Sequence, residues 1–260
     1  MHPPEPPRTA AILVIGDEVL SGKTHDCNSH WLAGELYALG VALERVVVIP
    51  DLVAEIGRSV AALSEAHDVV FTSGGVGPTH DDLTYAGIAR GFSRALVRNE
   101  ALVERMRVHY RDTLNEARLR MADIPEPDEL CFENGMVTPV VRVHNVYILP
   151  GVPVLFRQLF GGLRERFRRQ AMYLGQLFTK QPEGDIADLM TCVVEAHPAV
   201  RVGSYPHLGD EAFRVKITVE STDESAARAA LESIAAGLDP LALVERREVQ
   251  RVLAPGSADC

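Results

Sequence analysis

Hydrophobic residues in the first part of the chain follow two alternating spacings. Residues 9–15 form a continuous apolar run, which is typical of a strand buried on both faces. Residues 28–39 carry apolar side chains at helical spacing and end before Gly40, a common residue just beyond a helix. The two patterns predict strands at 9–15, 41–49 and 68–72 and helices at 28–39 and 53–66. Strands that alternate with helices predict an α/β fold, a three-layer sandwich with a mainly parallel sheet.

The pattern changes character near residue 170. Before this point the sequence predicts further helices at 81–92, 100–121 and 154–167 and strands at 138–143 and 145–149. After it, strand-like and helix-like segments follow in the order β-α-β-β-α, which predicts a small α+β C-terminal domain with an antiparallel sheet. The expected organisation is a proline-rich disordered tail at 1–8, an α/β domain at 9–170, an α+β domain at 171–240 and a C-terminal tail at 241–260.

The amino-acid composition argues against several kinds of binding partner and cellular environment for this protein. The net charge of −10 argues against nucleic acid as a main ligand, because nucleic-acid-binding proteins neutralise phosphates with clustered Lys and Arg. The four cysteines are far apart and form no C-x-x-C pair, so we expect reduced thiols rather than a disulfide framework. The sequence has no long apolar run, so we expect no membrane contact and a cytoplasmic location.

A glycine-rich stretch follows the third predicted strand, where residues 72–84 read TSGGVGPTHDDLT. A turn of this kind between a strand and a helix directs backbone N–H groups and a positive helix end toward an anion. Asp81 and Asp82 nevertheless place two carboxylates there, and Asp17 and Glu18 add two more after the first strand. Ligands of parallel sheets bind at the carboxyl ends of the strands, so we expect both loops to contribute to one site.

Two interpretations of these acids stay open. As structural residues, Asp81 would cap the following helix and Asp82 would lie in its first turn, where the helix dipole favours negative charge. As ligands, the acids would hold a divalent cation between themselves and a phosphate. Mg²⁺ in proteins commonly uses one or two carboxylates together with substrate phosphates. Four acids beside a glycine turn favour the second interpretation.

Two better-known phosphate motifs are incomplete. Residues 16–24, GDEVLSGKT, end like a P-loop but have five residues between the glycines where the motif has four. His80 stands where a dinucleotide-binding fingerprint that includes Gly75 and Gly77 needs its third glycine. The sequence therefore predicts neither a P-loop NTPase nor a Rossmann-type site.

The motifs together resemble a known family. VIGDEVLSG at 14–22, Asp26 and Asn28, SGGVGPT at 73–79 and LPGVP at 149–153 are similar to the molybdopterin-binding (MoaB/Mog-type) domain of CinA-like proteins. Residues 141–153 are similar to the corresponding domain of eukaryotic FAD synthases, and the last third of the chain resembles the companion α+β segment. The resemblance implies a phosphate- or ligand-binding pocket made by Gly16, Asn28, Ser73, Gly74, Gly75, Gly77, Pro78, Thr79, Pro150 and Gly151.

The leading hypothesis is metal-dependent hydrolysis of a phosphoanhydride in a dinucleotide or nucleotide-diphosphate compound of the FAD or ADP-ribose type. Mg²⁺, Mn²⁺ or Co²⁺ would be held by Asp17, Asp81 and Asp82; the catalytic set would be Asp81, Asp82 and Glu18, with Glu18 as a base. The alternatives are a non-catalytic module that holds molybdopterin and a molybdopterin adenylyltransferase of molybdenum cofactor biosynthesis. The expected partner is a small-molecule nucleotide or pterin, and the resemblance implies a homo-oligomer, dimer or trimer.

Overall fold

The computed structural model describes residues 6–132, 139–209 and 212–254 of the chain. Their contacts divide the chain into two compact units with a boundary at residues 169–170, and residues 37–40 are counted in the second. Of the predicted elements, the terminal tails and the start of the strand at 138–143 lie partly outside the described residues. Among the described residues, no helix combines the length and the apolar character needed to cross a membrane.

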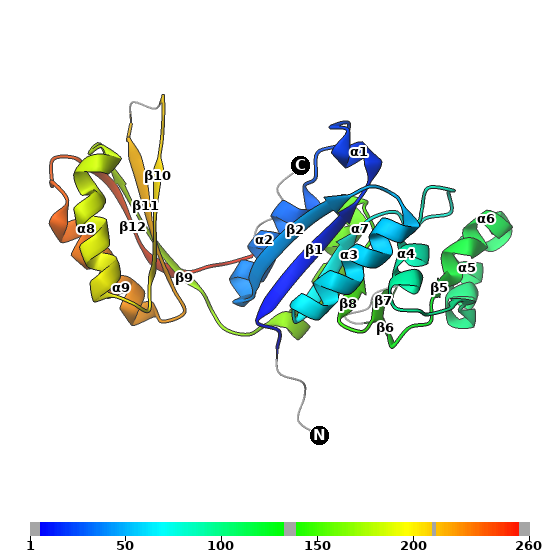
Figure 1. Ribbon diagram of the computed structural model, residues 1–260. Coiled ribbons are helices and arrows are strands. Elements are labelled where there is room, and N and C mark those ends of the chain that lie inside the picture. Colours follow the sequence, from blue (N-terminus) through cyan, green and yellow to red (C-terminus); the bar gives the residue numbers. More distant parts are fainter. Residues whose placement is uncertain (1–5, 133–138, 210–211, 255–260) are drawn as a thin grey trace, which may run out of the picture. The chain divides into compact units, whose positions relative to one another are not determined.

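The first unit is built on a six-stranded sheet, which confirms the predicted mainly parallel α/β sandwich (Figure 1). Its order is β2 (Ala42–Ile49), β1 (Thr9–Ile15), β3 (Val69–Ser73), β8 (Val146–Ile148), β7 (Val140–Val143) and β6 (Glu129–Cys131). The first four strands pair in parallel, whereas β7 and β6 run antiparallel. The carboxyl ends of β2, β1, β3 and β8 therefore share one edge of the sheet.

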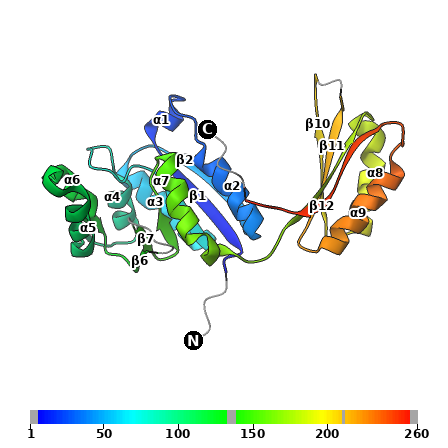
Figure 2. The ribbon, with the colours of Figure 1, turned by 180° about the vertical axis from the view of Figure 1, so that it is seen from behind.

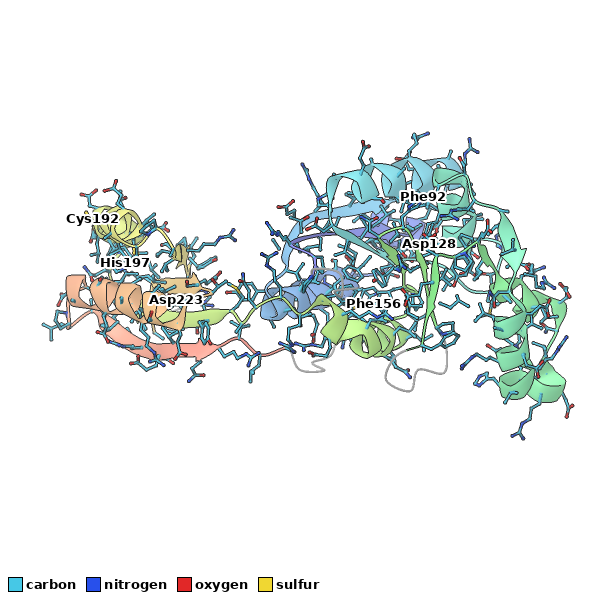
Figure 3. The ribbon with its side chains drawn as sticks, turned by 90° about the horizontal axis from the view of Figure 1, so that it is seen from below. Phe92, Asp128, Phe156, Cys192, His197 and Asp223 are labelled. Atoms are coloured by element: carbon cyan, nitrogen blue, oxygen red, sulfur yellow. The ribbon has the colours of Figure 1, made fainter. Side chains whose placement is uncertain are left out.

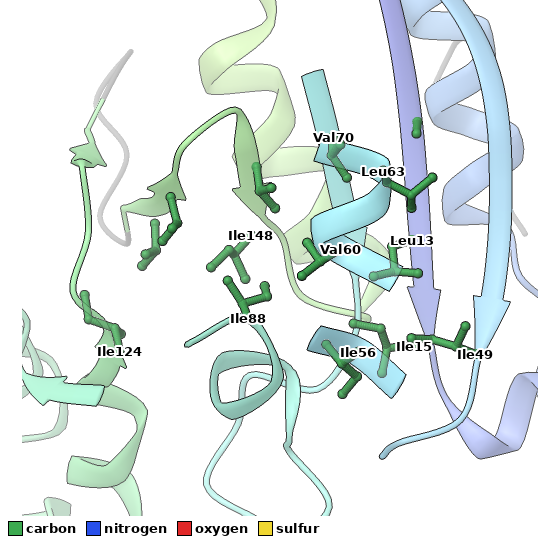
Figure 4. Close-up of a cluster of buried hydrophobic side chains, with 14 of the residues drawn as sticks. Leu13, Ile15, Ile49, Ile56, Val60, Leu63, Val70, Ile88, Ile124 and Ile148 are labelled. Atoms are coloured by element: carbon green, nitrogen blue, oxygen red, sulfur yellow. The ribbon is translucent and has the colours of Figure 1, made fainter. Parts of the chain in front are cut away.

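Alternate residues of β1 face opposite layers because side chains alternate along a strand. Leu13 and Ile15 join a buried cluster with Ile56 and Val60 of α3 (Val53–Ala66) and Ile88 of α4 (Thr84–Gly91), as Figure 4 shows. This cluster fixes α3 and α4 on one face of the sheet.

Aromatic side chains cover the opposite face. Phe71 of β3 packs edge-on against Phe160 of α7 (Pro153–Leu163), with ring centroids 5.5 Å apart. Trp31 of α2 (Asn28–Leu39) contacts the same ring at 5.7 Å. Figures 2 and 3 show α2 and α7, which carries the labelled Phe156, on the side of the sheet away from α3. The predicted three layers are thus confirmed.

The predicted helix at 100–121 is wrong, because the chain is broken there into shorter pieces. They are α5 (Glu100–Tyr110), a 3-10 turn (Arg111–Thr113), α6 (Glu116–Leu119) and a second 3-10 turn (Arg120–Ala122), flanked by the paired strands β4 (Leu96–Arg98) and β5 (Asp123–Pro125). Arg111 has φ of 46°, which a helix cannot continue through. Asn115 then caps α6 by accepting the N–H of Arg118.

The second unit is a four-stranded antiparallel sheet with two helices on one face. The elements are β9 (Tyr173–Thr179), α8 (Glu183–Ala196), β10 (Arg201–Pro206), β11 (Val215–Ser221), α9 (Glu224–Gly237) and β12 (Leu243–Arg251), in the sheet order β10-β11-β9-β12. The prediction of a C-terminal tail at 241–260 is wrong for residues 243–251, because they form β12 and pair with β9. Leu243 and Val249 of this charged strand pack in the core, which overrides its polar composition.

The expectation of reduced thiols also needs a correction. Cys131 is buried and Cys192 is exposed, and neither forms a disulfide. Cys27 is disulfide-bonded, so the expectation is wrong for this residue. Cys260 lies outside the described residues.

The close packing of α3 on α4 depends on glycine. A Cβ at Gly87 would overlap Cβ and Cγ2 of Ile56, atoms near the backbone that cannot swing aside. We expect Gly87→Ala to lower the free energy of unfolding by about 2 kcal/mol, within the usual range for overpacking. Urea unfolding measures this change. Gly184→Ala in α8 is the control, because nothing lies within 4 Å of its Cβ, and an equal loss there would contradict the packing argument.

Candidate functional site

Four loops leave the shared carboxyl edge of the sheet and are tied to one another by backbone contacts. The N–H of Gly16 donates to the Ile49 carbonyl at 3.0 Å, which joins the loops after β1 and β2. The N–H of Gly151 donates to the Gly74 carbonyl at 2.9 Å, which joins the loops after β8 and β3. The predicted convergence of the residue-16 and residue-74 loops on one edge therefore follows from the parallel pairing of β1 with β3.

The glycine loop at 74–79 is braced from within by Asp82. One oxygen of this carboxylate accepts the backbone N–H of Thr79 at 2.7 Å and the Thr79 hydroxyl at 2.5 Å. A Cβ at Gly75 would lie 2.6 Å from Asp82 Oδ1, and one at Gly77 would lie 2.8 Å from Oδ2. Both positions need glycine because the carboxylate occupies that space.

The same loop leaves several donors free. Within the described part of the chain, no acceptor pairs with the backbone N–H groups of Gly75, Val76 or Gly77. The loop lies between strand β3 and the start of α4, and Thr84 donates its N–H to the Gly75 carbonyl at 3.3 Å. Free backbone donors at such a turn are suited to an anion.

The start of the loop is enclosed on its inner side. A Cβ at Gly74 would lie 2.6 Å from the Thr84 hydroxyl and 2.9 Å from Ile15 Cβ, so a larger residue has no room. The Thr84 side chain is fully buried, and its hydroxyl has no partner among the described residues. Gly74 also forms a parallel bridge with Pro150, which brings the loop after β8 alongside.

Asn28 joins three of the loops. Its side chain is buried at the first residue of α2, and its Nδ2 donates to Ser73 Oγ and to the Gly151 carbonyl, each at 2.8 Å. Asp26 holds this helix start by accepting the N–H groups of Asn28 and Ser29, each at 3.1 Å. Asn28, Ser73 and Gly151, predicted as site residues by resemblance, therefore lie together.

Acidic side chains gather beside the loop. The N–H of Asp17, at the start of the short helix α1 (Asp17–Leu20), donates to Asp51 Oδ2 at 2.9 Å. Burial raises the pKa of Asp51 above its usual value; the Asp17 N–H acts against this, and the nearby charges of Glu18, Asp17 and Asp81 raise the pKa further. Asp17 and Asp51 are thus joined through a backbone N–H, and the charges of Glu18, Asp17 and Asp81 act on the Asp51 carboxylate at this edge of the sheet.

Asp51 was missed from the sequence. It follows β2 after Pro50, as Asp17 follows β1 and Asp81 follows β3. The sequence does carry a signal for Asp51, because this acid follows a third predicted strand whose carboxyl end lies on the same parallel edge.

The structure contradicts the prediction that Asp81 caps the helix and that Asp82 lies in its first turn. Helix α4 begins at Thr84 with Leu83 as its N-cap residue, so Asp81 does not cap it and Asp82 is not in its first turn. The predicted helix start at 81 is wrong because Asp82 turns back to Thr79. Asp81 remains exposed, and its pKa is held below the usual value mainly by the Thr79 hydroxyl.

A divalent cation fits this edge by donor chemistry. In the part of the chain that the structure describes, no three His, Cys, Asp or Glu side chains converge as a ready-made metal site. Mg²⁺ needs only one or two carboxylates when substrate phosphates supply other oxygens, and Asp17 and Asp51 are two carboxylate residues joined at this edge by the bond from the Asp17 N–H to Asp51 Oδ2. Asp17, Asp51 and Asp81 are the carboxylates placed to contribute, whereas Asp82 is already bonded to Thr79.

Comparison with known families assigns both units. A model described as "Probable molybdopterin binding domain" matches residues 11–169, and one described as "FAD synthase, middle domain" matches residues 171–247. The chain belongs to the molybdopterin-binding-domain family. The two matched ranges meet near residue 170, where the contacts of the chain also divide.

Individual relatives agree with this assignment. The chain is 37% identical over 268 residues to a "Probable FAD synthase" of Caenorhabditis briggsae, a match that covers 90% of this chain and 51% of that protein. It therefore spans about half the length of that relative. A protein of Aeropyrum pernix is 32% identical, with 91% of this chain and 96% of that protein covered.

A solved structure supports the fold. The protein CinA from Thermoplasma acidophilum, whose function is described as unknown, is 30% identical with a TM-score of 0.56. The match covers 62% of this chain and 98% of that chain. The resemblance to CinA-like proteins, with similarity to FAD synthases, is thereby confirmed.

Proposed function

We propose that the chain hydrolyses the phosphoanhydride of a dinucleotide of the FAD or ADP-ribose type in a metal-dependent reaction. The carrying observation is that the loops with Asp17, Glu18, Asp51 and Asp81 leave the same carboxyl edge of the sheet as the glycine loop, whose N–H groups at 75–77 have no acceptor among the described residues. Anion donors and anionic side chains at one place are compatible when a cation lies between the carboxylates and a phosphate. The FAD synthase names of the family model and of the nematode relative support a flavin dinucleotide as substrate.

The residues of the chain would divide the work. The N–H groups of Gly75, Val76 and Gly77 would bind the phosphate and stabilise the charge that develops on its oxygens. Asp51, with Asp17 or Asp81, would hold the cation, which polarises the phosphoryl oxygens when it is bound. Asp82 would keep the loop in shape through Thr79, and Glu18 would take the proton from the attacking water.

One assay tests the proposal. Purified protein is incubated with FAD, ADP-ribose or NADH, each with Mg²⁺, Mn²⁺ or Co²⁺ or with a chelator, and AMP release is followed by chromatography. We expect AMP from at least one dinucleotide with metal and none with the chelator, because the carboxylates alone repel the phosphates. AMP release at the same rate with and without the chelator would contradict the metal dependence.

The second candidate is a module that binds molybdopterin without turnover, and its support is the description of the family that matches residues 11–169. Pterin binding without cleavage of any dinucleotide would favour this module. A molybdopterin adenylyltransferase would instead consume ATP only when a pterin acceptor is present. Self-association as a dimer or trimer and a cytoplasmic location remain predictions from the sequence.

A further inference from the structure

An arginine from a distant part of the first unit contacts the glycine loop. Arg120 begins the second 3-10 turn, and its Nη2 donates to the Pro78 carbonyl at 3.0 Å across 42 positions of sequence. The Arg120 side chain is exposed, and no carboxylate among the described residues pairs with it. A positive side chain with no acidic partner therefore lies against the loop that carries the free N–H groups.

The backbone of Arg120 is held in place by packing rather than by its bond to Pro78. Ala122, two residues later, is fully buried, and its carbonyl accepts the N–H of Asn99 at 2.9 Å. Leu119, one residue earlier, packs against the buried cluster that contains Leu13 and Ile88. Only the side chain of Arg120 reaches the loop, so its replacement should leave the turn folded.

Other arginines of the same segment are neutralised by acids. The ion pairs are Arg94 with Asp128, Arg98 with Glu116 and Asp123, and Arg107 with Glu104. Arg120 differs, because its one bond is to a neutral carbonyl and its other N–H donors have no acceptor among the described residues. The planar fork of a guanidinium matches two oxygens of a phosphate.

The row of backbone donors in the loop ends where Arg120 makes its contact. The free N–H groups belong to residues 75–77. Pro78 has no N–H, and the N–H of Thr79 is already bonded to Asp82 at 2.7 Å. Residues 72–84 also contain no Lys or Arg of their own. Arg120 therefore supplies donors and positive charge at the end of the loop where the backbone supplies neither.

We infer that Arg120 binds the second phosphate group of a diphosphate and makes the site select diphosphates over monophosphates. The first phosphate group would be bound by the N–H groups at 75–77, and the adjacent one would accept from the guanidinium beside Pro78. This inference rests on the proposed function and adds the residue that determines how many phosphate groups the site requires.

A purely structural role for the same bond makes a different prediction. If Arg120 only braced the loop through Pro78, its loss would disturb the N–H groups at 75–77 and weaken every phosphate ligand alike. Asp82 already braces the loop through the N–H and hydroxyl of Thr79. As a ligand of the second phosphate group, Arg120 would matter for a diphosphate alone.

Equilibrium binding to the full chain separates the two roles without requiring turnover. The probes are inorganic phosphate and inorganic pyrophosphate, each with Mg²⁺, measured by calorimetry on wild type, Arg120→Gln and Arg120→Lys. Arg107→Gln is the matched control, because Arg107 is an exposed arginine of α5 whose side chain bonds to Glu104 at 3.2 Å. It removes the same charge from the same segment. Thermal unfolding establishes that each variant is folded.

The expected result in Arg120→Gln is a Kd for pyrophosphate that rises about tenfold to a hundredfold, from the loss of a hydrogen bond between charged groups. The Kd for phosphate should stay within about twofold, because the backbone N–H groups that bind it are unchanged. Arg120→Lys should be intermediate for pyrophosphate, since an ammonium keeps the charge but lacks the fork. Arg107→Gln should change neither Kd.

Three outcomes would overturn the inference. In the first, Arg120→Gln binds pyrophosphate as tightly as wild type does. In the second, the variant loses phosphate and pyrophosphate to the same extent, which would show that Arg120 only braces the loop. In the third, Arg107→Gln weakens pyrophosphate as much as Arg120→Gln, which would indicate a general effect of charge. Failure of wild type to bind either probe would reject the proposed function as well.

Discussion

Replacing Asp51 with Asn is expected to lower kcat/KM for metal-dependent cleavage of FAD by about a hundredfold or more. Loss of a residue that only supports a metal ligand typically costs about 10- to 100-fold, and loss of a ligand itself should cost at least as much. The substitution removes a carboxylate on which the charges of Asp17, Glu18 and Asp81 act. Asn keeps an oxygen that can accept the N–H of Asp17, now made to Asp51 Oδ2 at 2.9 Å. The loop should therefore keep its shape while the cation loses a ligand.

Stability separates this effect from misfolding. Crowded carboxylates repel one another, so the Asp51→Asn protein should unfold at the wild-type temperature or above it. Asp68→Asn is the matched control, since Asp68 precedes β3 at the opposite edge of the sheet and accepts the N–H groups of Arg8 and Thr9. It should retain FAD cleavage. Unchanged turnover in Asp51→Asn, measured as AMP release across Mg²⁺ concentrations, would remove Asp51 from the site.

Replacing Gly75 with Ala is expected to abolish pyrophosphate binding and dinucleotide cleavage and to lower the free energy of unfolding by about 1–3 kcal/mol. The new Cβ would lie 2.6 Å from Asp82 Oδ1 and 3.1 Å from Asp82 Cα. The carboxylate can move only by giving up its bonds to Thr79 N–H and Oγ1. The loop that carries the free N–H groups would lose its brace.

Gly161→Ala in α7 provides the control, because nothing lies within 4 Å of a Cβ at this helical position. That variant should be as active as wild type and more stable by about 0.5–1 kcal/mol, since Ala is favoured over Gly inside a helix. Calorimetry with pyrophosphate and urea unfolding measure the two effects. A Gly75→Ala protein that binds pyrophosphate like wild type would show that the loop does not need this glycine.

Local sequence determined the framework of the first unit. The strand predicted at 9–15 and the helices predicted at 28–39 and 53–66 coincide with β1, α2 and α3. Each has a long and regular apolar pattern whose buried face is set by the period of the element itself. The glycine loop was also identifiable, because strand, glycines and helix start follow one another directly along the chain.

Tertiary structure decided what depends on residues that are distant in sequence or on competing local bonds. Asp51 joins Asp17 and Asp81 only because β2, β1 and β3 pair in parallel and end at one edge. Asp82 was expected in a helix, but its bonds to Thr79 and its fit beside Gly75 turn it into the loop. The charged segment at 243–251 becomes a strand because β9 offers it a partner. Periodicity determined the elements, and pairing between distant segments determined the site, because side chains from separate loops meet only when the sheet is assembled.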